Sequence, residues 1–214
     1  MRLNTHDINA MDKRERAAFV NSLSGYKSAN LVGTADSGGH TNLAIMSSTV
    51  HLGSSPPLLA LVIRPGGDER HTLANILETG HYSLNHVTAT LVESAHQTAA
   101  RYAREVSEFD ATGLTPLWLP GFSAPLVEQA QIKLAMELRE HQQLQINQTH
   151  LVIGEVVLVD MPDHCLLEEG SVDLALAGTV ALSGLDTYHD PVTIKQMAYA
   201  KPDLPPRAID KRSG

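Results

Sequence analysis

The sequence predicts a single, mainly β domain, an antiparallel β-barrel with peripheral helices. Extended apolar runs outnumber helical ones, and short turn signals such as DSGG at residues 36–39 separate them. Strands that follow one another through short turns close more easily into an antiparallel barrel than into a parallel sheet. The chain has 214 residues, 43% of them hydrophobic, so it can bury one good core.

Six runs are expected to form the strands. They cover residues 26–35, 41–52, 58–64, 81–87, 131–139 and 151–159. The fifth run is ambiguous, because its residue types favour a helix whereas its apolar residues alternate with polar ones. Alternation would place Ile132, Leu134 and Met136 on one face of a strand, so we follow the period of two. Gly154, inside the last run, suggests a bulge or a close approach of another segment.

Three helices are expected beside the strands. Residues 11–23 have an amphipathic pattern with Asp12 as a possible N-cap, and this helix is expected to form a lid on the core. The second helix should begin near Thr72 and end before Gly80, a residue that suits a left-handed C-terminal cap. Residues 90–102 should form the third, because their first four residues have the spacing of a capping box.

Composition limits the partners and the location of the protein. The net charge of −8 argues against a nucleic-acid partner, since phosphate backbones require a basic surface. Cys165 is the only cysteine, which excludes an intrachain disulfide and fits a reducing compartment. No apolar run approaches the roughly 18 residues of a membrane span, and the N-terminus lacks the apolar region of a signal peptide. We therefore expect a cytoplasmic protein without a membrane partner.

The same patterns divide the chain into three parts. Residues 1–23 form an N-terminal helical extension, 24–202 form the domain, and 203–214 form a polar C-terminal tail. The segment from Ala200 onward is rich in proline and charge and cannot build a core. It is expected to be disordered or to lie across a partner subunit.

One stretch, residues 42–75, gathers hydroxyl groups and arginines around a predicted helix start. Its polar members are Ser47, Ser48, Arg64, Arg70 and Thr72. If the flanking strands are neighbours, these groups can converge on a phosphate, which would suit a phosphorylated cofactor. The alternative is that the arginines flank a solvated loop and the serines are ordinary strand residues. The eleven histidines include no HExxH motif, so we expect no metal site.

Five motifs occur in a characteristic order. They are NLAIMSSTVHLGSSPP, VIRPGGDERHTLANI, AHQTAARYAREVSEF, THLVIGEV and GLDTYH. In this order and spacing they resemble the flavin reductase-like family, nearest to its flavoredoxin-type members. The resemblance covers about residues 24–202. It implies a six-stranded antiparallel split barrel of the FMN-binding type, usually a homodimer with FMN at or near the subunit interface.

The resemblance also implies roles for individual residues. Those that would face the flavin ring and ribityl chain are Asn42, Ala44 and Met46, and those toward the phosphate are Ser47, Ser48, Arg64, Arg70, Thr72 and Asn75. His150 stands where many relatives have the histidine of a Gly-Asp-His triplet near the reactive part of the ring. It is therefore the candidate catalytic residue, although here Gln148 and Thr149 precede it.

Three functions remain open from the sequence. The first is an oxidoreductase that transfers a hydride from NAD(P)H to FMN, as the resemblance implies. The second is an electron carrier that keeps FMN bound and is reduced by a partner protein. The third is a non-redox split-barrel protein that binds haem, a phosphorylated ligand other than FMN, or nothing. No dinucleotide fingerprint of the Rossmann type is present from which to choose between NADH and NADPH.

Overall fold

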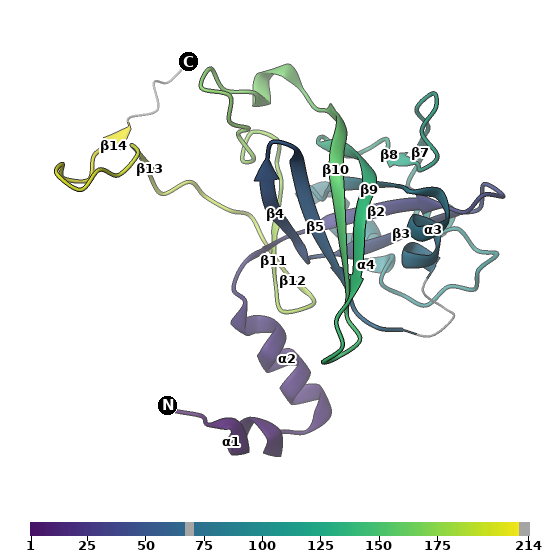
Figure 1. Ribbon diagram of the computed structural model, residues 1–214, viewed down its shortest axis with the longest axis horizontal. Coiled ribbons are helices and arrows are strands. Elements are labelled where there is room, and N and C mark those ends of the chain that lie inside the picture. The colour runs from purple at the N-terminus through teal and green to yellow at the C-terminus, as the bar shows by residue number, and fades with distance from the viewer. Residues whose placement is uncertain (67–70, 210–214) are drawn as a thin grey trace.

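A seven-stranded antiparallel sheet forms the centre of the computed structural model, which describes residues 1–66 and 71–209 (Figure 1). The strand order is β3-β2-β6-β9-β10-β5-β4. These strands are β2 (Asn30–Ala35), β3 (Thr41–Met46), β4 (Thr49–Ser54), β5 (Pro57–Ile63), β6 (His81–His86), β9 (Lys133–Gln143) and β10 (His150–Asp160). The fold is mainly β, a split barrel with peripheral helices, as predicted.

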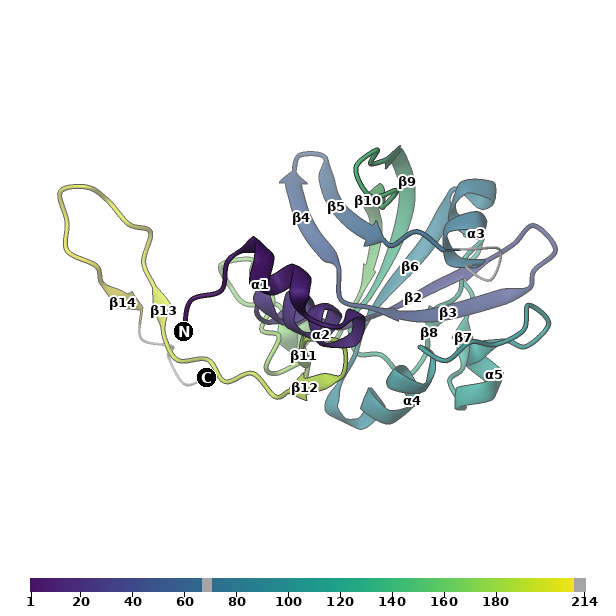
Figure 2. The same ribbon diagram turned by 90° about the horizontal axis from the view of Figure 1, so that it is seen from below.

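The edge strands β3 and β4 follow each other in the chain and are joined by Ser47 and Ser48. Figure 2 shows the strands fanning out from the point where β3 passes into β4. The sequence predicted one strand over residues 41–52, where the structure has both β3 and β4. The sheet therefore has seven strands instead of the six that were expected. The run divides because β3 pairs with β2 whereas β4 pairs with β5, so a single straight strand could not serve both partners.

Two hydrophobic cores lie on opposite faces of the sheet. Leu31 and Leu43 belong to the first core, which also contains residues of α4 (Val92–Gln97) and α5 (Glu108–Thr112). Val32 belongs to the second core, which is built from the inner faces of β2, β5, β6, β9 and β10 and from one side of α3 (His71–Thr79). Adjacent residues of β2 therefore point into different cores, as the pleat of a strand requires.

Gly154 lies where β10 makes its closest approach to the barrel interior. The register of β10 on β9 shifts between Ile153 and Gly154, so the predicted bulge is present. A Cβ atom at position 154 would lie 2.2 Å from the hydroxyl of the fully buried Tyr82. Both features that the sequence suggested for this glycine therefore occur.

The predicted helices form with two corrections. Asp12 caps α2 (Lys13–Leu23) as predicted, but no residue of α2 or of the preceding α1 (Thr5–Ala10) is buried. The helix projects from the barrel instead of forming a lid (Figure 1), and its apolar residues 17–20 and Leu23 are exposed or at most half-buried. The helix α3 ends before Gly80, whose φ of +74° is left-handed.

The third helix is shorter than predicted. A 3-10 turn, η1 (Ala89–Leu91), precedes α4, which ends at Gln97. The expected capping box does not form, because the hydroxyl of Thr90 bonds to the hydroxyl of Thr88. At the C-terminal end of α4, the hydroxyl of Thr98 donates to the carbonyl of Ala95. This bond competes with the main-chain bonds that would continue the helix.

The remaining elements lie around the barrel. They are β1 (Lys27–Ser28), β7 (Pro116–Leu117), β8 (Leu126–Val127), η2 (Asp163–Cys165), β11 (Ala181–Ser183), β12 (Thr187–His189), β13 (Gln196–Met197) and β14 (Ala208–Ile209). The hairpin of β13 and β14 extends away from the barrel in both ribbon views (Figures 1 and 2). Within residues 1–66 and 71–209, no helix has the length and apolarity needed to cross a membrane.

Candidate functional site

The ends of β3 and β5 meet at the Ser47–Ser48 junction. The Ser48 hydroxyl donates to the carbonyl of Val62 at 2.6 Å, and the Val62 N–H donates to the carbonyl of Ser48 at 3.1 Å. The exposed Arg64 follows β5 directly. The hydroxyl of Ser47, in contrast, has no partner among the residues that the structure describes. Ser47 and Ser48 thus lie beside the end of β5, which Arg64 follows, as the predicted phosphate site requires.

The helix α3 packs on the β2–β3 hairpin near its turn, at the end of β3 opposite to Ser47. The Asn42 side-chain amide donates to the Thr72 hydroxyl at 2.9 Å, and the Asn75 amide donates to the Thr34 hydroxyl at 3.1 Å. Asn42, Thr72 and Asn75 are all buried. The side-chain amide oxygen of Asn75, Oδ1, is also buried and accepts no hydrogen bond from any described residue. Such an acceptor is costly to leave without a donor, which makes it a candidate ligand contact.

Alternation along β3 places the predicted ring-facing residues together. Asn42, Ala44 and Met46 pair with Thr34, Val32 and Asn30 on one face, and Met46 packs against the inner core. Leu43 and Ile45 point to the opposite face and its core. The three residues therefore share a face, although the amide of Asn42 is already engaged with Thr72.

Side chains from residues 98–108 brace the outer edge of β3. The main-chain N–H of Leu43 donates to the Glu108 carboxylate and that of Ile45 to the Thr98 hydroxyl, both at 2.9 Å. Edge strands expose unpaired N–H groups, and these two bonds satisfy them. Burial raises the pKa of Glu108, although the bond from Leu43 favours the charged form. These bracing roles were not predicted. Their only signal in the sequence is the motif AHQTAARYAREVSEF.

His150 lies at the start of β10 and pairs with another imidazole. Its cross-strand neighbour on β5 is Ile63, the residue before Arg64. Its Nδ1 is 2.9 Å from Nε2 of His141, and the rings are stacked with centroids 5.1 Å apart and planes 15° apart. One imidazole donates to the other, so the pair orients both rings. The sequence analysis did not identify His141, since only the β9–β10 register brings it to His150.

The structure thus brings Ser47, Ser48, Arg64 and His150 to the end of β5, whereas Asn42, Thr72 and Asn75 form a second group at the start of β3. Arg70 lies outside the described residues. The roles assigned to the others remain predictions at this point, because geometry alone shows where the side chains lie and not what they bind. Among the residues described, no group of three histidine, cysteine, aspartate or glutamate side chains is placed to hold a metal ion.

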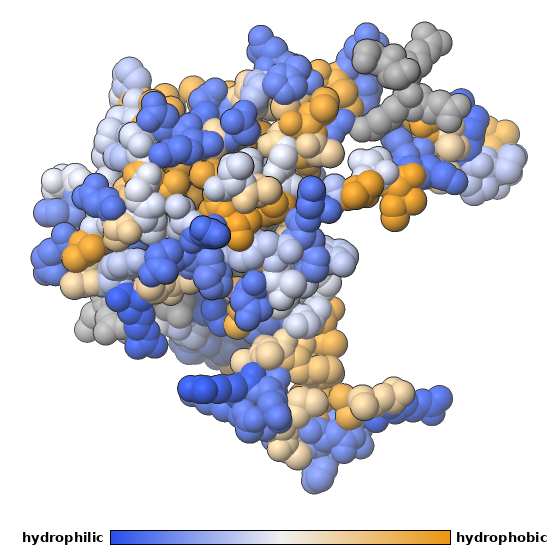
Figure 3. All heavy atoms as spheres, turned by 180° about the vertical axis from the view of Figure 1, so that it is seen from behind, coloured by the Kyte–Doolittle hydropathy of each residue, from blue (hydrophilic) through white to orange (hydrophobic). Residues whose placement is uncertain are grey.

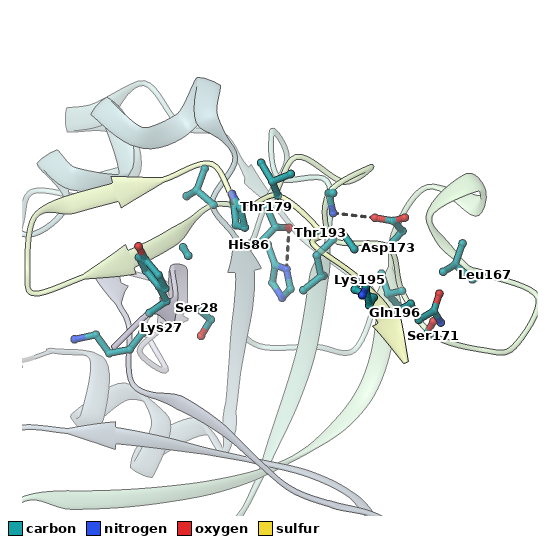
Figure 4. A pocket seen from close by; sticks show the side chains of 18 residues that line it. Lys27, Ser28, His86, Leu167, Ser171, Asp173, Thr179, Thr193, Lys195 and Gln196 are labelled. Carbon is teal, nitrogen blue, oxygen red and sulfur yellow. Dashed lines mark hydrogen bonds between the residues drawn. The ribbon is translucent and has the colours of Figure 1, made fainter. Parts of the chain in front are cut away.

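A cavity of about 540 Å³ lies elsewhere, between the β1–β11 pair and the segment that follows β12 (Figure 4). Its lining includes His86, Val172, Leu174, Thr179 and Val192. Nδ1 of His86 is 3.3 Å from the hydroxyl of Thr179, and burial lowers the pKa of His86 to about 4. None of the predicted site residues lines this cavity.

Known proteins are similar to this chain in sequence and in fold. Residues 23–175 match the family model described as flavin reductase like domain. A candidate flavin reductase with a split barrel domain, from Shewanella frigidimarina NCIMB 400, has a known crystal structure, and its sequence is 50% identical to this chain. The two structures superpose with a TM-score of 0.90 over 94% of this chain and 100% of that one.

Two more distant structures have the same fold. Flavoredoxin of Desulfovibrio vulgaris (Miyazaki F) is 22% identical, with a TM-score of 0.68 over 84% of this chain and 92% of its own. An FMN-binding protein from Thermus thermophilus, with bound 1-cyclohex-2-enone, is 22% identical, with a TM-score of 0.63 over 78% and 86%. At these identities the likeness extends to the fold alone.

Proposed function

The chain belongs to the flavin reductase-like family, and on that premise we propose that it binds FMN at the β3–β5–α3 junction and transfers a hydride to it from NAD(P)H. The observation that carries the proposal is the position of Ser47 and Ser48 beside the end of β5, which Arg64 follows directly. A phosphate group is bound by hydroxyl and guanidinium donors that lie in one place, and this junction offers both.

The donors and acceptors of the junction fit FMN. Arg64 and the Ser47 hydroxyl are suited to the phosphate, which carries the negative charge. The buried side-chain oxygen of Asn75, Oδ1, which lacks a donor among the described residues, is suited to a hydroxyl of the ribityl chain. A site built for inorganic phosphate alone would have no use for such an acceptor.

The flavin ring supplies the redox chemistry when it is bound, because it accepts the hydride. The chain positions the reactants. Asn42 holds α3 against the hairpin, and Ala44 and Met46 offer an apolar wall on the same face of β3. We assign His150 the catalytic role of holding a proton near the ring, with His141 fixing the orientation of its imidazole.

We also propose that the protein acts as a homodimer with FMN near the subunit interface. The family resemblance supports this assembly. A separate redox protein is the proposed acceptor of electrons from the reduced flavin.

The first test measures FMN binding by the quenching of flavin fluorescence. Arg64→Ala should raise the dissociation constant about 10-fold to 100-fold, because a charge-assisted hydrogen bond to the phosphate is lost. Arg14→Ala, on the projecting helix α2, is the matched control and should leave the constant unchanged. Equal affinities in the two variants and the wild type would contradict the location of the phosphate.

The second test separates a reductase from a carrier. The FMN-loaded protein is mixed rapidly with NADH or NADPH, and the flavin absorbance near 450 nm is followed over time. A reductase should bleach with at least one nucleotide and oxidise it in steady state with added FMN. A carrier would keep its absorbance with both nucleotides and lose it only when a reduced partner protein is added.

A further inference from the structure

The cavity beside β1 and β11 has none of the predicted flavin-site residues in its lining. We propose that it binds a small uncharged aromatic compound with a hydroxyl or carbonyl group, whose polar atom forms a hydrogen bond with Nε2 of His86. The proposal gives the protein a second ligand site and does not depend on what the predicted flavin site binds.

The cavity has the size and the lining of a small-molecule site. Its volume of about 540 Å³ lies within the roughly 300–1,000 Å³ that sites for small organic ligands occupy. Most of its wall is apolar, and the residues that form this wall are Leu167, Val172, Leu174, Val180, Pro191 and Val192. Figure 3 shows hydrophobic residues on the body and on the C-terminal segment, beside the point where that segment leaves the body. An apolar wall in contact with water is unfavourable, so a ligand with an apolar body is favoured there.

The floor of the cavity is held in place by main-chain hydrogen bonds. The His86 N–H donates to the carbonyl of Ile132, and the Val180 N–H donates to the carbonyl of Val87, both at 2.9 Å. These two bonds fix the end of β6 against the segments on either side of it. A floor that is already fixed loses little conformational freedom when a ligand binds, and this favours affinity.

The imidazole of His86 is the polar anchor of the cavity. Its Nδ1 is 3.3 Å from the hydroxyl of Thr179, whereas its Nε2 has no hydrogen-bond partner among the described residues. Figure 4 shows the ring among the lining side chains, with one nitrogen turned toward Thr179. Burial lowers the pKa of His86 to about 4, so the imidazole is uncharged at neutral pH. One nitrogen of an uncharged imidazole donates and the other accepts, so Nε2 can bond to a ligand hydroxyl or to a ligand carbonyl.

The charged residues of the lining favour an uncharged ligand. The ammonium group of Lys27 already donates to two main-chain carbonyls, and Lys195 is exposed. The carboxylate of Asp173 accepts from the main-chain N–H of Ala175 at 3.0 Å. A charged ligand that leaves water needs an opposite charge beside it, and the described lining offers no buried charge that is open to such a pairing.

The first test compares two leucines of the same loop. Leu174 lines the cavity and is 47% exposed, whereas Leu176 is 58% exposed and is not part of the lining. Titration calorimetry of the full chain with 2-naphthol, with and without saturating FMN, should show one site per chain. Leu174→Trp should weaken this binding at least about tenfold, because the larger ring occupies the cavity. Leu176→Trp is the matched control and should leave the affinity unchanged.

The second test concerns the hydrogen bond from His86. Phenylalanine keeps an aromatic ring at this position but cannot bond to the ligand. His86→Phe should therefore weaken the binding of 2-naphthol about tenfold and should not weaken that of naphthalene, which has no hydroxyl group. In the wild type, the charged analogue 2-naphthoate should bind at least about tenfold more weakly than 2-naphthol.

Four results would overturn the proposal. They are the absence of 2-naphthol binding at millimolar concentration, equal affinities in the two tryptophan variants, an equal loss of naphthalene and 2-naphthol binding in His86→Phe, and tighter binding of 2-naphthoate than of 2-naphthol. Competition between 2-naphthol and FMN would also overturn it, because the ligand would then lie at the flavin site. The titration without FMN does not depend on the proposed flavin site, so failure of one proposal is distinguishable from failure of the other.

Discussion

Replacing Gly154 with alanine should destabilise the barrel, because the added methyl group has no space. An ideal Cβ at this position would lie 2.2 Å from Oη of Tyr82, 2.8 Å from its Cζ and 3.0 Å from its Cε1. Tyr82 is fully buried in β6 and packed in the inner core, so its ring cannot swing into solvent. Either β10 or the ring of Tyr82 has to move. A movement of β10 can also displace His150, which precedes Gly154 by four residues in the same strand.

The size of the effect follows from two opposing contributions. Overpacking of a well-filled core typically costs about 1–3 kcal/mol. Alanine restricts the unfolded chain more than glycine does and returns roughly 0.4–1 kcal/mol. The net loss for Gly154→Ala is therefore about 1–2 kcal/mol, or about 2–8 °C in Tm for a domain of this size.

A double-mutant cycle with Tyr82→Phe tests the cause. The hydroxyl of Tyr82 is the nearest atom to the added methyl group and has no hydrogen-bond partner among the described residues. Tyr82→Phe alone should be neutral or stabilising by about 1 kcal/mol, because a buried hydroxyl without a partner is costly. In urea unfolding, Gly154→Ala should cost at least about 1 kcal/mol less in the Phe background. Equal costs in the two backgrounds would refute the steric explanation.

Three further changes test other parts of the structure. Glu108→Ala leaves the buried N–H of Leu43 without its acceptor and should lower the free energy of unfolding in urea by about 2 kcal/mol. Glu108→Gln keeps an oxygen acceptor and should lower it by less than half as much. Equal losses in the two variants would contradict the bracing role of Glu108. A main-chain N–H donor lowers the pKa of Asp36 from its ordinary 3.8 to about 2 in the folded state. Ionised Asp36 therefore stabilises the fold fully above pH 3.8, and this stabilisation is lost as the pH falls from 3.8 to about 2. Asp36→Asn should therefore flatten the pH dependence of unfolding in that interval, and an unchanged slope would argue against the shift. His141→Ala should lower the kcat of NAD(P)H oxidation about tenfold while the fold stays intact, since the ring of His150 is no longer oriented; an unaltered kcat would show that His141 has no positioning role.

Patterns within a few residues predicted the local structure well. Asp12 caps α2, Gly80 ends α3 in a left-handed conformation, and the alternation in residues 131–139 forms the strand β9 in spite of its helical residue types. In each case the physical cause lies within the segment itself. A cap needs only the next three residues, and alternation needs only one buried and one exposed face.

The family and the fold could also be predicted from the sequence, because the motifs occur in a fixed order. The lid position of α2 could not be predicted. Whether an amphipathic helix covers a core depends on the surface that it meets, and α2 meets none of the barrel.

The amino-acid sequence by itself determined which residues carry hydroxyl, amide and guanidinium groups, and which short segments form helices or strands. Only the tertiary structure decided that the run 41–52 divides at Ser47 and Ser48, that Glu108 braces β3, and that His141 orients His150. The last two contacts join residues of different elements, and the division of the run follows from the pairing of β3 and β4 with different strands. Such pairings depend on how the whole sheet closes, because the position of each strand is set by its neighbours and not by its own residues.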